Sequence, residues 1–244
     1  MKLALISDIH GNSWALTEVL KDLEKRKPDM IVNLGDTFYG PLDPRGTFDL
    51  MKPYAMISVS GNEDRIITED VEERHNSPTL QFVRSQLPDE GFYWLQALKK
   101  TESLDCGALL CHGTPDSDTT YLVEKVLQTH VGIRDDAELD LLLSVVRQSF
   151  VFCGYSHRHN FLQTTKHSIV NPGSVGLQAY DDDMPVFHVI ENFNTCAYYC
   201  MVELSDNDCA VEHIAVPYDF DSASMCAAAN GRSDWAKWLK TGRA

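Results

Sequence analysis

The sequence predicts an α/β fold in which two packed β-sheets lie between outer helices. Two observations on the 244 residues point to this class. In the first two-thirds of the chain, short apolar runs alternate with segments of helical periodicity. From residue 161 onward, short alternating segments follow one another with turn residues between them, which is typical of an antiparallel or mixed sheet. Strands that first alternate with helices and then run together favour sheets covered by helices on the outside.

The first part of the chain predicts a β-α-β unit followed by a further helix and strand. The expected elements are a strand at 3–6, a helix at 13–26, a strand at 30–34, a short helix around 48–51 and a strand at 55–59. The strands are apolar runs (LALI, MIVNL, AMISV), and the longer helix carries Leu16, Val19, Leu20 and Leu23 at helical spacing.

The rest of the chain continues this pattern. We expect a helical insertion at about 64–103 with breaks near Pro78 and Pro88, a strand at 107–111, a helical region around 117–148 and a strand at 150–153. Strands follow at 167–170, 185–190, 197–204 and 209–216, and a C-terminal helix at about 221–240. No repeat or Ser/Gly-rich linker divides the chain, so residues 1–244 are predicted to form a single domain.

The charge balance narrows the classes of partner. The chain carries 21 basic and 36 acidic residues, a formal net charge of −15 at pH 7. Binding to a nucleic-acid backbone requires clustered Lys and Arg, so we expect no such partner. An acidic protein can still bind a phosphate ester if bound cations invert the local field. The sequence does not define an oligomeric state.

Cysteine usage and hydropathy indicate the compartment. The seven cysteines are scattered without paired spacing, and several lie in apolar runs, which is typical of reduced thiols. No apolar run approaches membrane-spanning length, and the apolar run at the N-terminus is too short for a signal sequence. We therefore expect a cytoplasmic protein without a membrane partner.

Polar side chains follow each of five predicted strands, at the point where the strand ends. They are, in chain order, Asp8 and His10 (SDIHGN), Asp36 (GDTFYG), Asn62 and Glu63 (GNED), His112 (CHGTP), and Tyr155, His157 and His159 (CGYSHRHN). If the strands run in one direction in one sheet, these groups collect along its C-terminal edge, where open α/β sheets place their ligand sites. Carboxylates, an amide oxygen and imidazoles together suit Mn²⁺, Fe²⁺, Zn²⁺ or Ni²⁺, with one or two ions per chain.

Each motif taken alone has an ordinary structural explanation. D-x-H is commonly the start of a capped helix, for which Asn12 is a suitable N-cap, and GN and GD are common turn dipeptides. His112 alone fits a core histidine whose hydrogen bonds are satisfied. The ordered series is harder to explain in this way, because buried Asp and His side chains cost free energy when they lack partners.

The ordered series resembles the calcineurin-like metallophosphoesterase family, whose pattern is D-x-H, G-D, G-N-H, a later His and G-H-x-H. The resemblance covers nearly the whole chain, because GDTFYGPLDP, CHGTPDSD, VNPGSVGLQAYDDD and NGRSDWAKWLKTGRA look like one bacterial branch of the family. It implies a four-layer α-β-β-α sandwich, in which two mixed β-sheets are flanked by helices and a dinuclear centre lies at the strand ends.

The resemblance also implies ligands and a reaction. The ligands implied for the first ion are Asp8, His10, Asp36 and His157. The second ion is implied to share Asp36 and to take Asn62 and His112. The reaction is hydrolysis of a small phosphate ester or nucleotide-like substrate, in which ions about 3.5–4 Å apart bind the phosphoryl oxygens and lower the pKa of a bridging water. The residues expected to take part in catalysis are Asp36, Asn62, Glu63 and His112.

Two positions depart from the family pattern. Glu63 stands where G-N-H has its histidine, and a glutamate with a reference pKa of about 4.3 is mostly ionised at neutral pH. It can act as an acid only if burial or a neighbouring carboxylate such as Asp64 raises its pKa. Tyr155 replaces the first histidine of G-H-x-H, and its neutral phenol is a poor ligand at pH 7. The second ion would then have fewer protein ligands and a lower affinity.

Four residues near the motifs are candidates for substrate contact. They are Arg65, Tyr155, His159 and Ser174 in the turn NPGSVG. Arg65 is otherwise a surface arginine, and Ser174 otherwise part of a strand-connecting turn. His159 lies two residues after His157, so an extended backbone would place both on one face, although an exposed loop position is the favoured alternative. The helical insertion at 64–103 is expected to shape the substrate pocket.

These features support two functions from different classes. The first is an active metal-dependent phosphatase or phosphodiesterase that favours esters with good leaving groups. The second is a catalytically weakened or inactive metal-binding or regulatory homologue that keeps the fold, as the two missing histidines suggest. A nuclease on the same fold is disfavoured by the net charge.

Overall fold

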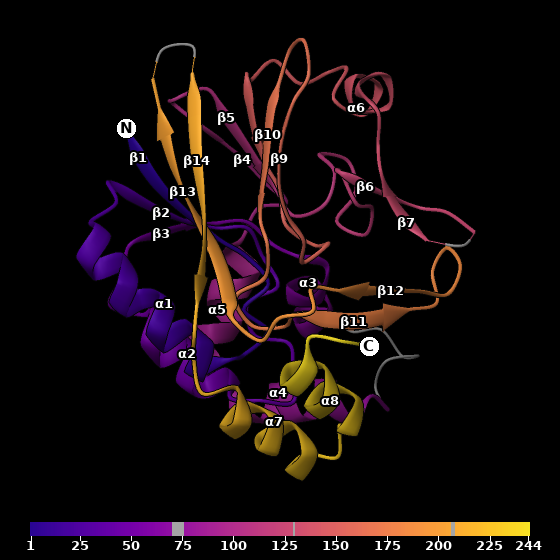
Figure 1. Ribbon diagram of the computed structural model, residues 1–244. Helices are drawn as coiled ribbons and strands as arrows, with labels where there is room; N and C mark the ends of the chain where they lie inside the picture. The colour runs from indigo at the N-terminus through magenta and orange to yellow at the C-terminus, as the bar shows by residue number, and fades with distance from the viewer. Residues whose placement is uncertain (70–75, 129, 206–207) are drawn as a thin grey trace.

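Two five-stranded sheets form the centre of the molecule (Figure 1). The computed structural model describes residues 1–69, 76–128, 130–205 and 208–244. The strands of the first sheet are, in spatial order, β14 (Cys209–Val216), β13 (Ala197–Leu204), β1 (Lys2–Ile6), β2 (Met30–Asn33) and β3 (Met56–Ser58). Those of the second sheet are β4 (Thr101–Leu104), β5 (Ala108–Cys111), β8 (Phe150–Phe152), β10 (Ser168–Pro172) and β9 (His159–Gln163).

Both sheets are mixed. In the first sheet β1, β2 and β3 run parallel, and β13 and β14 pair antiparallel beyond them. In the second sheet β5, β8 and β10 run parallel, and β4 and β9 pair antiparallel at the two edges. Each sheet therefore has a parallel centre, whose strands end at a common edge.

Helices and two small hairpins complete the described part of the chain. The helices are α1 (Ser13–Arg26), α2 (Pro44–Met51), α3 (Asn62–Thr68), α4 (Pro78–Gln86), α5 (Asp89–Ala97), α6 (Asp136–Leu142), α7 (Phe220–Ala229) and α8 (Ser233–Thr241). The hairpins pair β6 (Glu124–Val126) with β7 (Val131–Ile133), and β11 (Ala179–Asp182) with β12 (His188–Glu191). Asn12 caps α1 as predicted, because its side chain accepts a hydrogen bond from the Ala15 N–H.

Three apolar clusters hold the layers together. Alternation along β1 sends Leu3 and Leu5 into a cluster between the two sheets, which includes Leu110 and Phe152 of the second sheet. Ala4 and Ile6 belong instead to the cluster that contains the buried leucines of α1. On the far side of the second sheet, side chains of β5, β8 and β10 pack against α6 and the segment before β6. The order helix, sheet, sheet, helix confirms the α-β-β-α sandwich.

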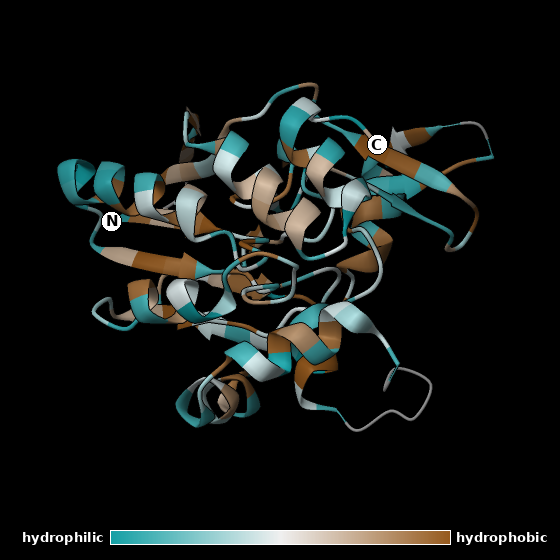
Figure 2. Cartoon of the chain, turned by 90° about the horizontal axis from the view of Figure 1, so that it is seen from below, coloured by the Kyte–Doolittle hydropathy of each residue, from teal (hydrophilic) through white to brown (hydrophobic). Residues whose placement is uncertain are grey.

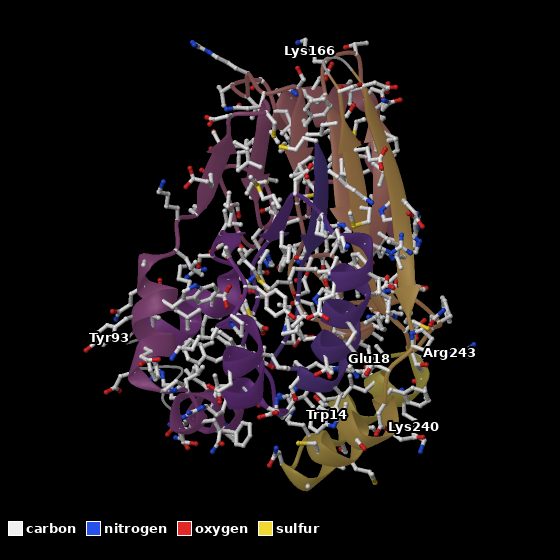
Figure 3. All side chains as sticks on the ribbon, turned by 90° about the vertical axis from the view of Figure 1, so that its left-hand side faces the viewer. Trp14, Glu18, Tyr93, Lys166, Lys240 and Arg243 are labelled. Atoms are coloured by element: carbon white, nitrogen blue, oxygen red, sulfur yellow. The ribbon has the colours of Figure 1, made fainter. Side chains whose placement is uncertain are left out.

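The distribution of hydrophobic and exposed residues follows from this layering. Figure 2 shows hydrophobic colour concentrated on the strands and on the sides of helices that face them. Figure 3 shows Trp14 and Glu18 of α1 beside the two C-terminal helices, whereas Tyr93 of α5 projects outward and is 69% exposed. No helix of the described ranges is both long and apolar enough to cross a membrane.

Several predicted elements differ from the structure. The region 117–148 is helical only at α6, and the β6–β7 hairpin occupies much of the remainder. The insertion at 64–103 is helical in α3, α4 and α5 but ends in β4, and residues 70–75 lie outside the described part. The single helix expected at 221–240 is two helices, because Gly231 between α7 and α8 has φ +79°. The strands β9 and β11 were not predicted.

Candidate metal centre

Six side chains from the two sheets meet where the parallel strands end. Asp8 and His10 follow β1, Asp36 follows β2, Asn62 begins α3 after β3, His112 follows β5, and His157 follows β8. The condition that all five strands share one sheet is not met, because β5 and β8 belong to the second sheet. The groups still converge, since the parallel strands of the two packed sheets end at the same place.

The convergence is close enough for shared ligation of an ion. His157 Nε2 lies 3.4 Å from Asp8 Oδ1, and His112 Nε2 lies 3.2 Å from Asp36 Oδ2. In the groups Asp8–His10–His157 and Asp8–Asp36–His112, the potential ligand atoms all lie within 4.8 Å of one another. Asp8 is common to both groups in this geometry, whereas the family resemblance gives the shared position to Asp36.

The three histidines are oriented by hydrogen bonds on their outer nitrogen. Each Nδ1 contacts a backbone carbonyl, which can only accept, so Nδ1 carries the proton and Nε2 keeps its lone pair. The acceptors for His10, His112 and His157 are the carbonyl oxygens of Tyr39, Leu34 and Leu177, at 3.0, 2.8 and 2.7 Å respectively. Such a contact fixes the ring of a metal-ligating histidine and makes its free nitrogen a better ligand.

Several inward-facing atoms make no hydrogen bond among the described residues. They are Oδ1 of Asp8, Oδ1 of Asn62 and Nε2 of His112, and all three are buried. Oδ1 of Asp8 and Nε2 of His112 have ion-pair contacts instead, at 3.4 Å to His157 and 3.2 Å to Asp36. Nε2 of His10 lies 3.0 Å from Nε2 of His157, a contact that is a hydrogen bond only when one of the two rings takes up a second proton. Divalent cations fit this set, because they would give these lone pairs a positive partner.

The electrostatics of the cluster favour positive charge at its centre. Burial alone would lower the pKa of His112, but Asp36 and Asp8 raise it to about 10. Burial alone would raise the pKa of Asp8, but the surrounding imidazoles, His157 first, lower it to about 2. A cation competes with protons for the same lone pairs, so a centre that stabilises positive charge in this way suits metal binding.

Unusual backbone conformations aim these side chains inward. Five residues of the cluster adopt positive φ values although none is glycine: Asp8 (54°), His10 (52°), Asp36 (54°), Tyr155 (68°) and His157 (57°). Left-handed conformations cost non-glycine residues free energy, and they concentrate at functional sites where the surrounding structure enforces them. Each of these turns bends the chain sharply just after a strand.

Two glycines let the turns approach one another. Gly35 has φ +102°, and a Cβ there would lie 2.9 Å from His112 Nδ1 and 2.8 Å from Gly61 Cα. A Cβ on Gly61 would overlap the Asp36 carboxylate. The close packing of these turns brings the Glu63 N–H within 2.8 Å of Asp36 Oδ1, to which it donates a hydrogen bond. Larger residues at either glycine would push the ligand residues apart.

Glu63 lies at the edge of the cluster, against a histidine. Its Oε2 is 3.0 Å from His10 Nδ1, and burial raises the pKa of its carboxyl group. The carboxylate that also favours this rise is Asp36, not Asp64 as the sequence suggested. Asp64 instead accepts hydrogen bonds from the backbone N–H groups of Thr37 and Gly61, at 2.8 and 3.1 Å. It therefore joins the two turns that carry Asp36 and Asn62.

Tyr155 lies beside the cluster and contacts it through its backbone N–H. Its N–H donates to Asp8 Oδ2 over 3.2 Å, and its ring centroid lies 5.4 Å from that of His112. Burial raises the pKa of its phenol, so the side chain is neutral at pH 7. The structure therefore brings Tyr155 to the position next to Asn62 and His112 without adding an ionised ligand there.

Arg65 and His159 are not brought to the cluster. The Arg65 guanidinium makes two hydrogen bonds to Asp118, at 2.7 and 3.2 Å, and also pairs with Glu69. His159 begins β9, where its ring stacks on Tyr198 with centroids 4.9 Å apart. The extended backbone that would align His159 with His157 is interrupted by the positive φ of His157. Neither side chain faces the inward-pointing ligand atoms.

Ser174 is close to the cluster but fully buried. Its hydroxyl donates to the Asp8 carbonyl at 2.9 Å and accepts from the Leu177 N–H at 2.9 Å, so it is committed to the fold rather than to a substrate. We expect Ser174→Ala to lower the free energy of unfolding by about 1–3 kcal/mol, because it leaves buried groups unpaired. Urea denaturation measures this loss. Ser85→Ala, which removes an exposed hydroxyl from α4, is the control, and equal stability of the two variants would contradict the assignment.

The C-terminal helix contributes residues that motif reasoning did not assign. Trp235 of α8 packs edge-on against the ring of His10, with centroids 5.7 Å apart, and Arg232 lies over the Trp235 ring at 5.5 Å. Tyr180 of β11 lies 4.6 Å from the His157 ring. The sequence signal for Trp235 and Arg232 was the segment NGRSDWAKWLKTGRA. This segment contributed to the family resemblance but contains no pattern of metal ligands.

The sandwich fold, with acidic, amide and imidazole side chains gathered at the strand ends, defines a protein of the metallophosphoesterase class. The chain belongs to the calcineurin-like phosphoesterase superfamily, whose domain is matched by residues 1–192. That range includes all six side chains of the candidate metal centre. It ends before β13, so the last strands of the first sheet and α7 and α8 lie outside it.

Known proteins with the same architecture are similar along their whole length. The uncharacterized protein MJ0912 of Methanocaldococcus jannaschii is 23% identical over 258 residues, covering 96% of this chain and 94% of its own. A metallophosphoesterase structure from Sphaerobacter thermophilus has a TM-score of 0.76 at 22% identity and covers 99% of this chain and 100% of that one. The structure of a hypothetical protein from Pyrococcus horikoshii has a TM-score of 0.77 at 18% identity and covers 99% of this chain and 98% of that one.

Proposed function

We propose that the protein hydrolyses phosphate esters in a metal-dependent reaction. The observation that carries this proposal is the cluster of buried, inward-facing ligand atoms, several of them without a hydrogen bond among the described residues, at the strand ends of a calcineurin-like phosphoesterase domain. The substrate class is a small phosphate ester or nucleotide-like compound. The acidic chain needs bound cations for such a substrate, because a phosphate group would otherwise be repelled by Asp8, Asp36 and Glu63.

The ligand assignment follows the two groups of side chains. We assign Asp8, His10, Asp36 and His157 to a first ion, and Asp36, Asn62 and His112 to a second, with Mn, Fe, Zn or Ni as the metals that suit these donors. Bound ions of this kind supply polarisation of the phosphoryl group and activation of water. The assignment of Asp36 to both ions is supported by its contact with His112 and by its place in a ligand group with His10.

The protein's own groups prepare the site in three ways. Backbone carbonyls fix the imidazoles so that their Nε2 atoms face inward, and Asp64 fixes the turns that carry Asp36 and Asn62. Trp235 and Tyr180 pack against the rings of His10 and His157 and hold them in place. Glu63 contacts His10 rather than replacing the missing histidine, so we expect a preference for esters with good leaving groups.

The test is turnover of p-nitrophenyl phosphate and its bis ester with Mn²⁺ or Ni²⁺ added. We expect metal-dependent release of p-nitrophenol that falls by about a thousandfold or more in Asp36→Asn, because the ions supply several kcal/mol of transition-state stabilisation. The variant keeps nearly the same side-chain volume, and its circular dichroism spectrum controls for folding. Equal rates for the wild-type protein and the variant would contradict the proposal.

The alternative function is a metal-binding or regulatory protein without catalysis. Two departures from the family pattern favour this alternative. Glu63 contacts His10, and Tyr155 adds no ionised ligand to the cluster. The number of ions in the purified protein separates the two proposals. A chain that binds one ion tightly and shows no turnover on either ester supports the alternative, whereas metal-dependent turnover excludes it.

A further inference from the structure

Two cavities adjoin one another at the metal centre. The smaller, of about 290 Å³, is lined by His10, Asp36 and His157, and the larger has a volume of about 660 Å³. Asn62, Tyr155 and Asp182 line both cavities, and because Asn62 is assigned to the second ion, the boundary between the cavities lies beside that position. A phosphoryl group bound at the metal centre would therefore border two separate spaces.

The smaller cavity has aromatic walls. Besides the ligand residues, its lining includes Tyr39, Tyr180, Trp235 and Trp238. Trp235 is held in place by its edge contact with His10 and by Arg232, which lies over its ring. Aromatic side chains favour stacking against a flat ring, so this cavity suits an aryl group of modest size.

The larger cavity is polar and contains an incompletely paired cation. Its lining includes Thr119, Thr120, Lys125 and Arg134, together with the carboxylates Glu124 and Asp182. Lys125 is neutralised by Glu138 at 2.6 Å. Among the residues that the structure describes, Arg134 has a buried Nε without a hydrogen-bond partner, and its Nη2 donates a long hydrogen bond of 3.4 Å to the Tyr121 carbonyl. A ligand with hydrogen-bond acceptors, such as a nucleoside, fits this volume and this guanidinium.

The charge of the smaller cavity disfavours a monoester. Its lining carries five carboxylates and one guanidinium among the described residues, and that guanidinium, Arg232, is paired with Asp234 at 2.7 Å. The carboxylates are Asp36, which is assigned to the ions, and Glu63, Asp181, Asp182 and Asp234, which remain to act on the substrate. A monoester brings a charge of about −1.5 to −2 at pH 7, whereas a diester brings a single negative charge and meets less repulsion.

We propose that the substrate is a phosphodiester, with an aryl-sized group in the smaller cavity and a nucleoside-like group in the larger. This inference rests on the proposed hydrolysis and extends it to the substrate class. Water adds to phosphorus, the bond from phosphorus to one ester oxygen breaks, and the proton from water passes to that leaving oxygen. The products are one phosphate monoester and one alcohol or phenol.

The experiment compares two substrates with the same leaving group. Thymidine 5′-(p-nitrophenyl phosphate) is the diester and p-nitrophenyl phosphate the monoester, both assayed with Mn²⁺. We expect kcat/KM for the diester to exceed that for the monoester at least about tenfold. Arg134→Met should reduce this ratio about tenfold through KM, because it removes a charged hydrogen-bond donor from the larger cavity. Arg45→Met is the control, since Arg45 is an exposed residue of α2 paired with Asp49.

A binding measurement gives a second readout that does not depend on turnover. We expect thymidine, which carries no phosphate, to bind the chelator-treated protein in a calorimetric titration, and Arg134→Met but not Arg45→Met to weaken this binding about tenfold. Equal or faster hydrolysis of the monoester would overturn the inference and leave the proposed hydrolysis standing. No turnover of either substrate would overturn both. An unchanged ratio and unchanged binding in Arg134→Met would overturn the assignment of the larger cavity.

Discussion

Removing metal is expected to lower the melting temperature by about 5–11 °C relative to protein with Mn²⁺ at a hundred times its dissociation constant. Binding at that concentration adds about 2.7 kcal/mol to the free energy of unfolding, and each kcal/mol shifts the melting temperature of a domain of this size by about 2–4 °C. The ligand atoms justify this size of effect. Oδ1 of Asp8 and Nε2 of His112 are buried and make no hydrogen bond among the described residues, so the ion-free protein carries part of their desolvation cost.

Differential scanning calorimetry with EDTA and with Mn²⁺ measures this shift. Asp36→Asn is the matched variant, because it exchanges a charged ligand for a neutral one of similar shape. Its metal-dependent shift should be less than half that of the wild-type protein. Identical melting temperatures with EDTA and with Mn²⁺ would show that these side chains do not hold an ion.

Replacing Tyr155 with His is expected to add a second tightly bound ion. We expect the wild-type protein to keep about one ion per chain through gel filtration in metal-free buffer, and the variant to keep about two. We expect the gain because Tyr155 already lies at the cluster. Its ring centroid is 5.4 Å from that of His112, and its N–H donates to Asp8. An imidazole in that place supplies a neutral nitrogen ligand beside His112 and Asn62.

Inductively coupled plasma mass spectrometry on the filtered protein counts the ions. Tyr155→Phe is the control, because it keeps the ring and adds no ligand, so its metal content should equal that of the wild-type protein. Two ions in the wild-type protein after filtration would contradict the expectation. So would an unchanged count in Tyr155→His whose folding is normal by circular dichroism.

The position of the cluster could be predicted because strand ends are visible in the sequence. Asp8, Asp36 and His112 each follow an apolar run directly, and strands of this length are readable from composition. The division of these strands between two sheets was not readable from the runs themselves, since pairing depends on contacts far apart in the chain. The pattern of strands and helices predicted two packed sheets, and the family resemblance supplied the four-layer α-β-β-α order.

The errors have local physical causes. The strands β6 and β7 span three residues each, too few for alternation to be told from helical spacing, so residues 117–148 were read as helix. An extended backbone would place His159 on the face of His157, but His157 adopts φ 57°, and His159 is exposed, as the favoured alternative predicts, although it lies in a strand and not in a loop. Left-handed conformations at Asp and His leave no compositional signal of the kind that glycine gives.

The hydrogen bond from His157 Nδ1 to the Leu177 carbonyl has a consequence for biosynthesis. His157 faces His10, which lies 147 residues earlier in the chain, and its Nδ1 donates to the carbonyl of a residue that is made 20 residues later. In a nascent chain this arrangement of His157 is complete only after residue 177 has been made and the two sheets have packed. An ion held by both His10 and His157, as we propose, would therefore be captured late in folding.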